Sequence, residues 1–510
     1  MAPLAGFRFR QVGTGPVEAR AGTLLALLGA EVVVLTDRDG ADAVLADATA
    51  PDHAGRLVAV GSPGDVTTVP AHATVDGTSS AVPIAGEPRV VAAGRLGGVA
   101  GWAASGAMAL TGRRDGPALP APGDVAAEMH AAAVVVELLS ALGGTRVALD
   151  GAALLGERAA LNGTTRTGDG TVGGAGRLLR AADGWVAVSL PRASDLGLLP
   201  AWLGLDPVGD GAPPWDAVAA AVAERPARDL TAAAQELGLA VGAVPTPGAP
   251  LADEQLAARS QGSPPVPFVI AGTAPPLPPA RALDASALAP LAGHPRRIAG
   301  RRVVDLSALW AGPLATSVLA AAGAEVTKVE STTRPDGARV GDPELFALLD
   351  AGRSHLLLDL GDPAQLEQLR LRCREADLVV EASRPRALDQ LGIERRAPWL
   401  SITAYGRTGP WSQWVGFGDD TAAAGGLVAW DEDGPVFVAD AAADPATGLH
   451  AAAAALAVLV GAPADVDLAL REVAAHLAGG TVPDPDPTAG NTAAVAPPRA
   501  RPAPTAAGTP

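Results

Sequence analysis

The stretch RRVVDLSALWAGPLATSVLAAAGAEVTKVE, residues 301–330, decides the fold. Residues 303–306 form a short apolar run, which predicts a strand, and a glycine-containing turn follows it. The apolar segment at about 314–322 predicts a helix, and residues 326–330 predict a second strand. Strand, helix and strand in this order are typical of a parallel sheet whose two faces are covered by helices.

The same alternation continues along the chain. HLLLDL (355–360), DLVVEAS (377–383) and PWLSITAYG (398–406) predict three further strands, and a charged helix is expected near residues 363–375. The AGP turn after the first strand lies where such sheets bind ligands, but it is not the GxGxxG fingerprint of dinucleotide-binding proteins. The sequence therefore predicts an α/β fold with a doubly wound, Rossmann-like parallel sheet. It gives little support to a nicotinamide-dependent dehydrogenase.

The N-terminal half repeats this pattern in shortened form. AGTLLALLGAEVVVL (21–35) corresponds to ATSVLAAAGAEVTKV (315–329), and AASGAMAL (103–110) corresponds to AAGGLVAW (423–430). A repeat with a period of roughly 300 residues indicates duplication of a whole domain. We therefore expect two large domains that pack on each other as a pseudo-dimer within one chain.

Only the first copy continues into a further unit, which contains the glycine loop TVGGAG (171–176) and an amphipathic helical stretch. A proline-rich linker leads from this unit to the second copy, and the end of the chain is rich in Pro, Ala and Thr without an apolar period, which predicts disorder. The expected units are a shortened large domain (1–164), a small α+β domain (165–290), a second large domain (299–480) and a disordered tail (481–510).

Each copy contains an aspartate followed, six residues later, by a histidine in a long apolar run. Asp444 begins DPATGLH in the second copy, and Asp124 begins DVAAEMH in the first. An aspartate at a helix start accepts hydrogen bonds from free backbone amides and is favoured in its ionised form. The residues alone leave two interpretations open for each aspartate, a plain helix cap and an ionised nucleophile.

Several segments of the second copy, taken in order, resemble one enzyme family. VVDLSALWAGPLAT, GAEVTKVE, LLLDL, EASRPR, SITAYGRTGP and ADPATGLHAA resemble the large domain of the class III (CaiB/BaiF-type) CoA-transferases. The first copy resembles the same domain in shortened form, and the unit at 165–290 resembles the small domain of the family. The resemblance implies a transferase that moves CoA from an acyl-CoA thioester to a carboxylic acid through a covalent aspartyl intermediate. Coenzyme A is then a substrate, and neither a prosthetic group nor a metal is expected.

The resemblance also implies roles for particular residues. It assigns the nucleophile to Asp444, with Asp124 as the second candidate. The loop at 171–176 is expected to close over the aspartate, against the alternative of an ordinary hairpin turn. Family positions that hold cations near CoA correspond to three arginines here, for which a solvated surface charge is the alternative. The loop glycines are Gly173, Gly174 and Gly176, and the arginines are Arg339, Arg353 and Arg384.

Other functions within the superfamily stay open. Racemases carry a histidine near the place where this chain has Phe417 and Gly418, and neither of these residues can deprotonate an α-carbon. This difference favours CoA transfer over racemisation. An intramolecular CoA-transferring isomerase and a CoA-ester-binding pseudoenzyme are the remaining alternatives.

Composition limits the partners and the location. The formal net charge of −17 argues against a nucleic-acid partner, and a single cysteine, Cys373, favours a reducing compartment. The N-terminal residues lack the layout of a secretory signal, and the apolar runs at 131–142 and 449–461 are interpreted as too short to span a membrane. We therefore expect a cytoplasmic protein that binds acyl-CoA and carboxylates, without nucleic-acid or membrane partners, as a monomeric pseudo-dimer or a homodimer.

Overall fold

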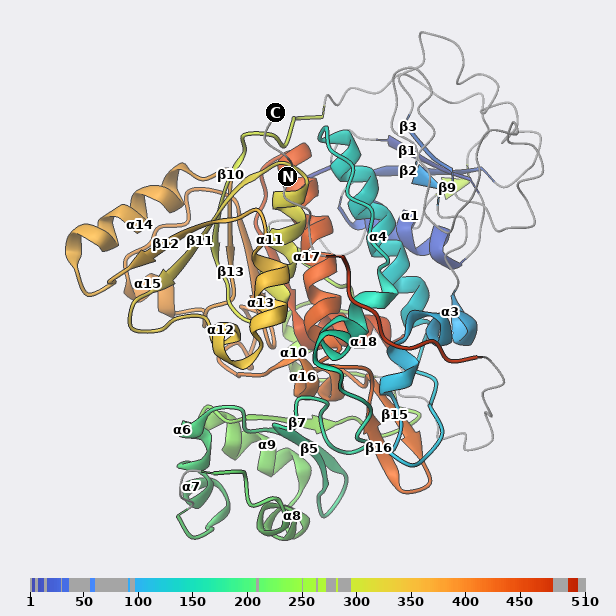
Figure 1. Ribbon diagram of the computed structural model, residues 1–510, viewed down its shortest axis with the longest axis vertical. Coiled ribbons are helices and arrows are strands. Elements are labelled where there is room, and N and C mark those ends of the chain that lie inside the picture. Colours follow the sequence, from blue (N-terminus) through green and yellow to red (C-terminus); the bar gives the residue numbers. More distant parts are fainter. Residues whose placement is uncertain are drawn as a thin grey trace.

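The computed structural model describes residues 2–4, 8–12, 16–28, 30–35, 56–59, 90–91, 97–207, 211–249, 251–262, 265–271, 281–282, 295–479 and 494–502. These residues form a larger body and a smaller lobe, which lies at the bottom of Figure 1. The body contains two sheets of parallel strands, and the lobe contains an antiparallel sheet.

The C-terminal half contains a seven-stranded sheet in the order β12-β11-β10-β13-β14-β17-β8. Every pairing in it is parallel except that of β8 with β17. Strand order reverses around β10, and this is where open α/β sheets bind ligands. The predicted α/β fold with a parallel sheet is confirmed. Its strands are β8 (Val269–Ile270), β10 (Arg302–Leu306), β11 (Glu325–Ser331), β12 (Ser354–Leu358), β13 (Leu378–Glu381), β14 (Trp399–Thr403) and β17 (Val466–Ala469).

Helices cover both faces of this sheet, because successive side chains of a buried strand point to opposite faces. Val303 of β10 belongs to the core beneath α11 (Ala311–Ala321) and α17 (Ala443–Val460). Its neighbour Val304 packs with Leu369 and Cys373 of α14 (Pro363–Glu375) on the other side. The consecutive valines of β10 are therefore explained by burial on two faces.

The N-terminal half contains a five-stranded parallel sheet in the order β4-β3-β1-β2-β9. Helix α1 (Pro16–Leu27) connects β1 to β2, as the repeat predicts. Most of residues 36–96, the middle of the shortened first copy, lies outside the described residues. The strands are β1 (Arg8–Val12), β2 (Glu31–Leu35), β3 (Arg56–Ala59), β4 (Val90–Val91) and β9 (Arg281–Ala282).

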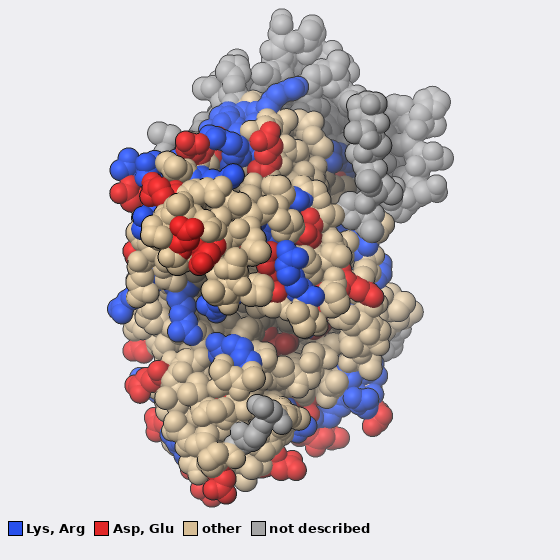
Figure 2. Space-filling view, turned by 60° about the vertical axis from the view of Figure 1, so that its left-hand side comes forward, with Lys and Arg blue, Asp and Glu red and all other residues tan. Residues whose placement is uncertain are grey.

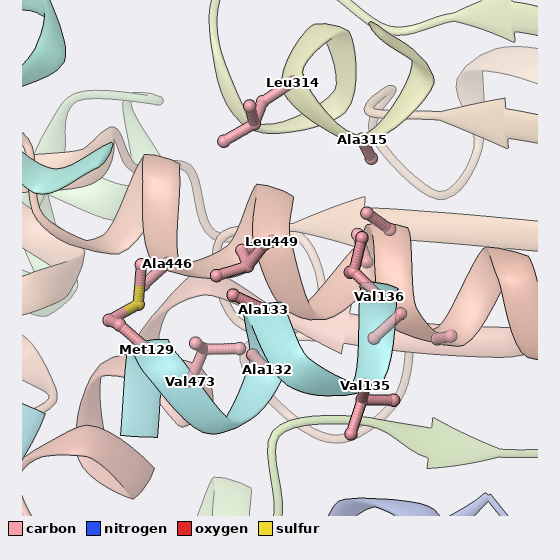
Figure 3. Close-up of a cluster of buried hydrophobic side chains, with 14 of the residues drawn as sticks. Met129, Ala132, Ala133, Val135, Val136, Leu314, Ala315, Ala446, Leu449 and Val473 are labelled. Carbon is pink, nitrogen blue, oxygen red and sulfur yellow. The ribbon is translucent and has the colours of Figure 1, made fainter. Parts of the chain in front are cut away.

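The two halves meet along α4 (Val125–Leu142) and α17, the corresponding helices of the repeat. Figure 3 shows Ala133 and Met129 of α4 directed at Ala446 and Leu449 of α17. Small side chains permit this close approach. Gly448 has the same function toward α11, because a Cβ there would lie 2.7 Å from the carbonyl oxygen of Ala311.

The lengths of α4 and α17 differ from the expectation that the apolar runs are too short to span a membrane. Each has 18 residues and is long and apolar enough to cross a membrane, so the apolar runs are not too short by that criterion. However, 94% of each is buried inside the protein. Their composition is thus explained by their place in a core shared by both halves.

The smaller lobe consists of β5 (Gly176–Arg180), β6 (Trp185–Ser189) and β7 (Ala240–Val244) with helices on one side. It has its own apolar core. The segment that follows β7 returns to the body, where α10 (Glu254–Ala258) contacts the C-terminal half and β8 joins its sheet. The helices of the lobe are α6 (Ala193–Leu196), α7 (Leu199–Leu203), α8 (Trp215–Ala223) and α9 (Ala227–Glu236).

Residues 494–502 differ from the disordered tail that composition predicts. They run in extended form past α3 (Gly98–Ser105) and reach the start of α5 (Glu157–Asn162), and Figure 1 shows them in dark red. The amide of Ala496 donates to the carbonyl of Ala103 at 2.9 Å. The prediction of disorder is wrong for this part of the tail, because its prolines and arginines contact the N-terminal half. Apolar periodicity within the tail gives no sign of these contacts.

Candidate active site

Asp444 lies in the first turn of α17 and is the one residue of that helix that is not buried. The helix begins at Ala443, and its N-cap residue, Ala442, makes no side-chain capping bond. Asp444 therefore lies inside the helix and is not its cap. The backbone amide of Gly418, at the start of α16 (Gly418–Ala424), donates to the Asp444 carboxylate. This carboxylate is thus held in place, and it belongs to a residue that is only partly buried.

Gly418 makes room for that carboxylate. A Cβ at this position would lie 2.5 Å from Asp444 Oδ2 and 2.5 Å from the carbonyl oxygen of Ala441. Both distances are well inside van der Waals contact. The sequence identified Gly418 only as a place without a base, whereas the structure shows that the missing side chain accommodates the candidate nucleophile.

Two further carboxylates and one guanidinium surround Asp444. Arg158 of α5 forms a two-pronged ion pair with the buried Asp440, in which Nε lies 3.0 Å from Oδ2 and Nη2 contacts Oδ1. Asp419 accepts a hydrogen bond from the amide of Ala441 at 3.0 Å. Arg158 comes from the N-terminal half, and the three aspartates come from the C-terminal half. The site is therefore formed by both halves of the chain.

The crowding of acids changes their protonation. Burial raises the pKa of Asp444 to about 6. The positive charge of Arg158 and the hydrogen bond from the Gly418 amide oppose this rise, while the negative charge of Asp440 adds to it. Burial and the neighbouring charge of Asp440 raise the pKa of Asp419 to about 7, and Arg158 opposes that shift. Both carboxyl groups therefore titrate closer to neutral pH than an ordinary aspartate does. The candidate nucleophile and a second carboxyl group with a raised pKa therefore lie in one cluster.

The backbone around the cluster is strained. Ala439 and Ala441, on either side of Asp440, have φ of 55° and 46°, in the left-handed region that residues with a Cβ rarely adopt. The hydroxyl of Thr111, in the N-terminal half, accepts from the Ala439 amide at 3.0 Å. Leu309, which follows β10, has φ of 69°. Strained backbone of this kind concentrates at functional sites, where surrounding contacts hold it in place.

The glycine loop reaches the cluster from the lobe. A Cβ on Gly173 would lie 3.6 Å from Nη2 of Arg158, so the tip of the loop is next to this guanidinium. The amides of Gly174 and Gly176 donate within the loop, to the carbonyl and the hydroxyl of Thr171. Among the described residues, no acceptor faces the amide of Gly173, which is exposed. Gly173 is therefore available to a ligand, while Gly174 and Gly176 shape the loop.

Asp124 has a different environment. It is the N-cap of α4, and its carboxylate accepts from the amides of Ala127 at 3.2 Å and Gly98 at 2.6 Å. Arg20 lies 3.9 Å from its other oxygen. These contacts are those of a helix cap, and they involve neither the glycine loop nor Arg158.

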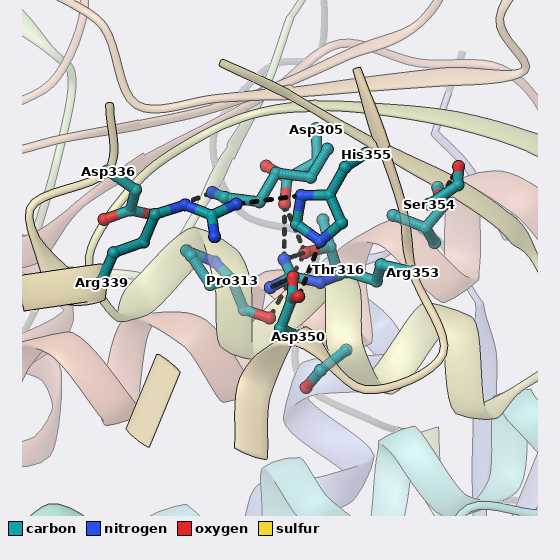
Figure 4. Close-up of polar contacts among 12 residues, drawn as sticks. Asp305, Pro313, Thr316, Asp336, Arg339, Asp350, Arg353, Ser354 and His355 are labelled. Atoms are coloured by element: carbon teal, nitrogen blue, oxygen red, sulfur yellow. Dashed lines mark hydrogen bonds and ion pairs between the residues drawn. The ribbon is translucent and has the colours of Figure 1, made fainter. Parts of the chain in front are cut away.

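The three predicted CoA arginines are also placed differently. Arg353 has no exposed side-chain surface and binds Asp305 at 2.8 Å and Asp350 at 3.0 Å, as Figure 4 shows. A fully buried and paired arginine has no free face for a ligand phosphate, so this structure does not favour the expected role of Arg353 in CoA binding, which stays a prediction. Arg339 is more exposed, but it is paired with Glu330 and contacts His355 Nδ1 at 3.1 Å.

Arg384 is the predicted arginine that faces open space. It follows β13 at the carboxyl edge of the sheet, is exposed, and forms no side-chain hydrogen bond or ion pair with the residues that the structure describes. It lines a pocket of about 360 Å³ between the lobe and the C-terminal half. Figure 2 shows a hollow between the lobe and the body, with basic side chains at its edge. The other lining residues are Gln235, Glu236, Leu237, Gly238, Pro410, Gln413 and Trp414.

Sequence reasoning missed Arg158, Asp419 and Asp440. The signal that points to the two acids is their place in the sequence, because Asp440 precedes Asp444 by about one helical turn and Asp419 directly follows Gly418. Arg158 carries no local signal, because it lies in an ordinary helix start of the other half. Its role appears only when the two halves pack together.

Comparisons with known proteins match mainly the C-terminal part of the chain. CoA-transferase family III matches residues 298–504. The chain is 34% identical to mouse succinyl-CoA:glutarate CoA-transferase over 179 residues, which cover 32% of this chain and 41% of the relative. It is 28% identical to succinate–glutarate CoA-transferase of Agrobacterium fabrum over 205 residues, covering 34% and 51%.

A solved structure also matches part of the chain. The crystal structure of a CAIB/BAIF family protein from Brucella suis shares 27% identity with the chain at a TM-score of 0.32, covering 35% of this chain and 54% of the other. The chain spans about two fifths to a half of the length of the curated relatives above. The family match and the named relatives support a relationship between the C-terminal part of this chain and CoA-transferase family III.

Proposed function

We propose that this protein is a CoA-transferase that moves CoA from an acyl-CoA thioester to a carboxylic acid, with Asp444 as the nucleophile. One observation supports the proposal most strongly. The carboxylate of Asp444 lies against the Gly418 amide, in a cluster where Arg158 and the tip of the glycine loop also meet.

The chemistry begins with attack by Asp444. A carboxylate oxygen adds to the thioester carbonyl, the C–S bond breaks, and CoA leaves as the thiolate, which gives a mixed anhydride. The thiolate then attacks the Asp444 carbonyl, which releases the donor acid and forms an aspartyl-CoA thioester. The acceptor carboxylate repeats the first exchange, and CoA attacks the acceptor carbonyl. The Asp444 carboxylate is thereby restored, and no net proton is consumed.

Arg158 and Gly173 have complementary roles in this scheme. Arg158 opposes the effect of burial on Asp444 and so keeps the nucleophile ionised near neutral pH. The exposed amide of Gly173 is the donor that we assign to the oxyanion of each tetrahedral intermediate. Asp440 holds Arg158 in position through their two-pronged ion pair.

CoA is assigned to the pocket beside Arg384. This guanidinium lies at the carboxyl edge of the sheet, where the strand order reverses, and it is free of protein partners in the described part of the chain. A phosphate there would gain a charge-assisted hydrogen bond. Arg339 becomes available only if it leaves Glu330. CoA acts as a substrate in this scheme.

The arrangement of the chain is part of the proposal. We assign residues 1–164 and 299–480 to two copies of one large domain that pack as a pseudo-dimer through α4 and α17. Residues 165–290 are assigned to the small domain. The first copy contributes Arg158, and the second contributes Asp444. Cytoplasmic localisation and the oligomeric state of the fused chain stay predictions.

A racemase or isomerase acting on acyl-CoA is the second candidate. The base expected at 417–418 is absent, but Asp419 lies in the same cluster as Asp444, and its pKa of about 7 suits proton transfer. Two acids with pKa values near neutrality could remove and return an α-proton. Incubation of a 2-methylacyl-CoA in D₂O distinguishes the two: deuterium at the α-carbon indicates racemisation, and its absence favours transfer.

The proposal is tested by turnover with a defined donor. Full-length protein is incubated with succinyl-CoA, chosen because the named relatives use succinyl groups, and a panel of carboxylic acids, and new acyl-CoA products are identified by mass spectrometry. Asp444→Asn should abolish product formation, whereas Asp433→Asn, at a side chain with 73% of its surface exposed, should not. Product formation by Asp444→Asn at the wild-type rate would reject Asp444 as the nucleophile.

A further inference from the structure

The C-terminal segment 494–502, here called the strap, fits closely against the N-terminal half. A Cβ at Gly106 would lie 2.5 Å from the carbonyl oxygen of Pro497, and one at Gly156 would lie 3.2 Å from Pro498 Cβ. Both glycines therefore leave space that the strap fills. The strap belongs to the last part of the chain, yet its contacts lie beside α5, which carries Arg158.

The strongest contact of the strap is between Arg501 and Glu157. The Arg501 amide donates to Glu157 Oε1 at 3.1 Å, Nε donates to the same oxygen at 2.7 Å, and Nη2 donates to Oε2 at 2.8 Å. The Glu157 side chain is only 1% exposed. A buried carboxylate needs such compensation, because an unpaired buried charge is strongly destabilising.

Glu157 and Arg158 are adjacent residues at the start of the six-residue helix α5. Glu157 binds the strap, while Arg158 binds Asp440, stacks over the Trp310 ring at 4.9 Å and lies next to Gly173. A helix this short has few contacts of its own to fix its position. Its first turn is thus held between the strap on one side and the active-site cluster on the other.

We propose that the strap positions Arg158, with Arg501 as a positioning residue that acts through Glu157. Arg501 is not in contact with the cluster itself; it fixes the start of α5, and this determines where the Arg158 guanidinium meets Asp440. The inference rests on the proposed function for its significance in catalysis, but its structural content can be tested separately.

Arg499 offers a matched control on the same strap. Its guanidinium pairs with Asp150, and both side chains are nearly half exposed, with 47% and 43% of their surface accessible. It also donates to the carbonyl of Ala104 at 2.8 Å. Loss of an exposed ion pair costs little. Arg499→Ala therefore removes an arginine from the strap without leaving a buried charge beside Arg158.

Hydrogen–deuterium exchange of the full-length protein tests the proposal without any substrate. The variants are Arg501→Ala, Arg499→Ala and Arg158→Ala. The readout is exchange in the segment 438–444, which forms no hydrogen bond or ion pair with the strap among the described residues. Arg158→Ala and Arg501→Ala should each raise exchange there by about tenfold or more, because the strained turn around Asp440 loses its anchor. Arg499→Ala should leave it unchanged.

A second variant covers the case in which Arg501→Ala does not fold. Arg501→Ala combined with Glu157→Gln removes the buried charge together with its partner, and exchange at 438–444 should still exceed that of Arg499→Ala. Raised exchange in α5 but not at 438–444, while Arg158→Ala does raise it, would overturn the proposal. Failure of the proposed function would appear elsewhere, as turnover by Asp444→Asn.

Discussion

Gly418→Ala tests whether the Asp444 carboxylate depends on the space that Gly418 leaves beside it. The new Cβ would lie 2.5 Å from the carbonyl oxygen of Ala441, 2.5 Å from Asp444 Oδ2 and 2.8 Å from Ala441 Cβ. The backbone at 418 is not in the left-handed region, so the cost is steric and not conformational. Overpacking of this kind typically costs about 1–3 kcal/mol.

The strain is expected to fall mainly on Asp444. The backbone around Ala441 is fixed by the bond from its amide to Asp419, whereas the Asp444 carboxylate can rotate. Rotation takes it away from the Gly418 amide and from its position for attack, and misplacement of a reacting group by about 1 Å costs on the order of 100-fold in rate.

The assay combines thermal unfolding with turnover of succinyl-CoA. Gly418→Ala should lower the melting temperature modestly and the rate strongly. Gly341→Ala is the matched control, because a Cβ at that glycine would meet nothing within 4 Å. A Gly418→Ala protein with an unchanged rate would refute the reasoning, since the carboxylate would then not depend on the space at this position.

Three further predictions follow from the charges. The folded-state pKa of Asp419, about 7, lies above its ordinary value of 3.8, so between these pH values the folded protein retains a proton that the unfolded chain has lost. The free energy of unfolding therefore falls as pH rises from about 4 to about 7. Asp419→Asn should raise the melting temperature at pH 8 and change it little at pH 4. Arg353→Ala should destabilise the protein by about 3–5 kcal/mol in chemical denaturation, because it leaves the buried Asp305 without its ion-pair partner. Arg384→Ala should preserve stability and weaken CoA binding by roughly 1–3 kcal/mol in calorimetry. The reverse pattern would exchange the roles of the two arginines. Asp124→Asn should retain turnover and the melting temperature, because asparagine caps a helix about as well as aspartate, and a large loss of turnover would give the first copy a catalytic role.

Local sequence patterns predicted much of the C-terminal half. Strand β10 spans residues 302–306, close to the expected 303–306, because a strand buried on both faces is rich in apolar residues. The helix expected near 363–375 is α14, which begins with Pro363 after the cap Asp362. These features depend on residues that are neighbours in sequence, so periodicity and capping rules are sufficient to find them.

Other features of these residues cannot be seen in the local sequence. Arg353 looks like an arginine after a turn, but its partner Asp305 arrives from another strand and buries it. Asp444 looks like a helix cap, but the chain before it enters the helix one residue earlier. Arg501 lies in a segment without apolar periodicity, and its order comes from Glu157 in the other half. Such pairings have no local signature.

The most direct test of the central claim is the location of the covalent intermediate. Full-length protein is mixed with succinyl-CoA, the activated carboxyl is captured with hydroxylamine, and the modified residue is identified by peptide mass spectrometry. The proposed mechanism predicts a hydroxamate at Asp444 that depends on succinyl-CoA and is lost in Asp444→Asn. A hydroxamate at Asp124, or turnover without a hydroxamate on any aspartate, would contradict it.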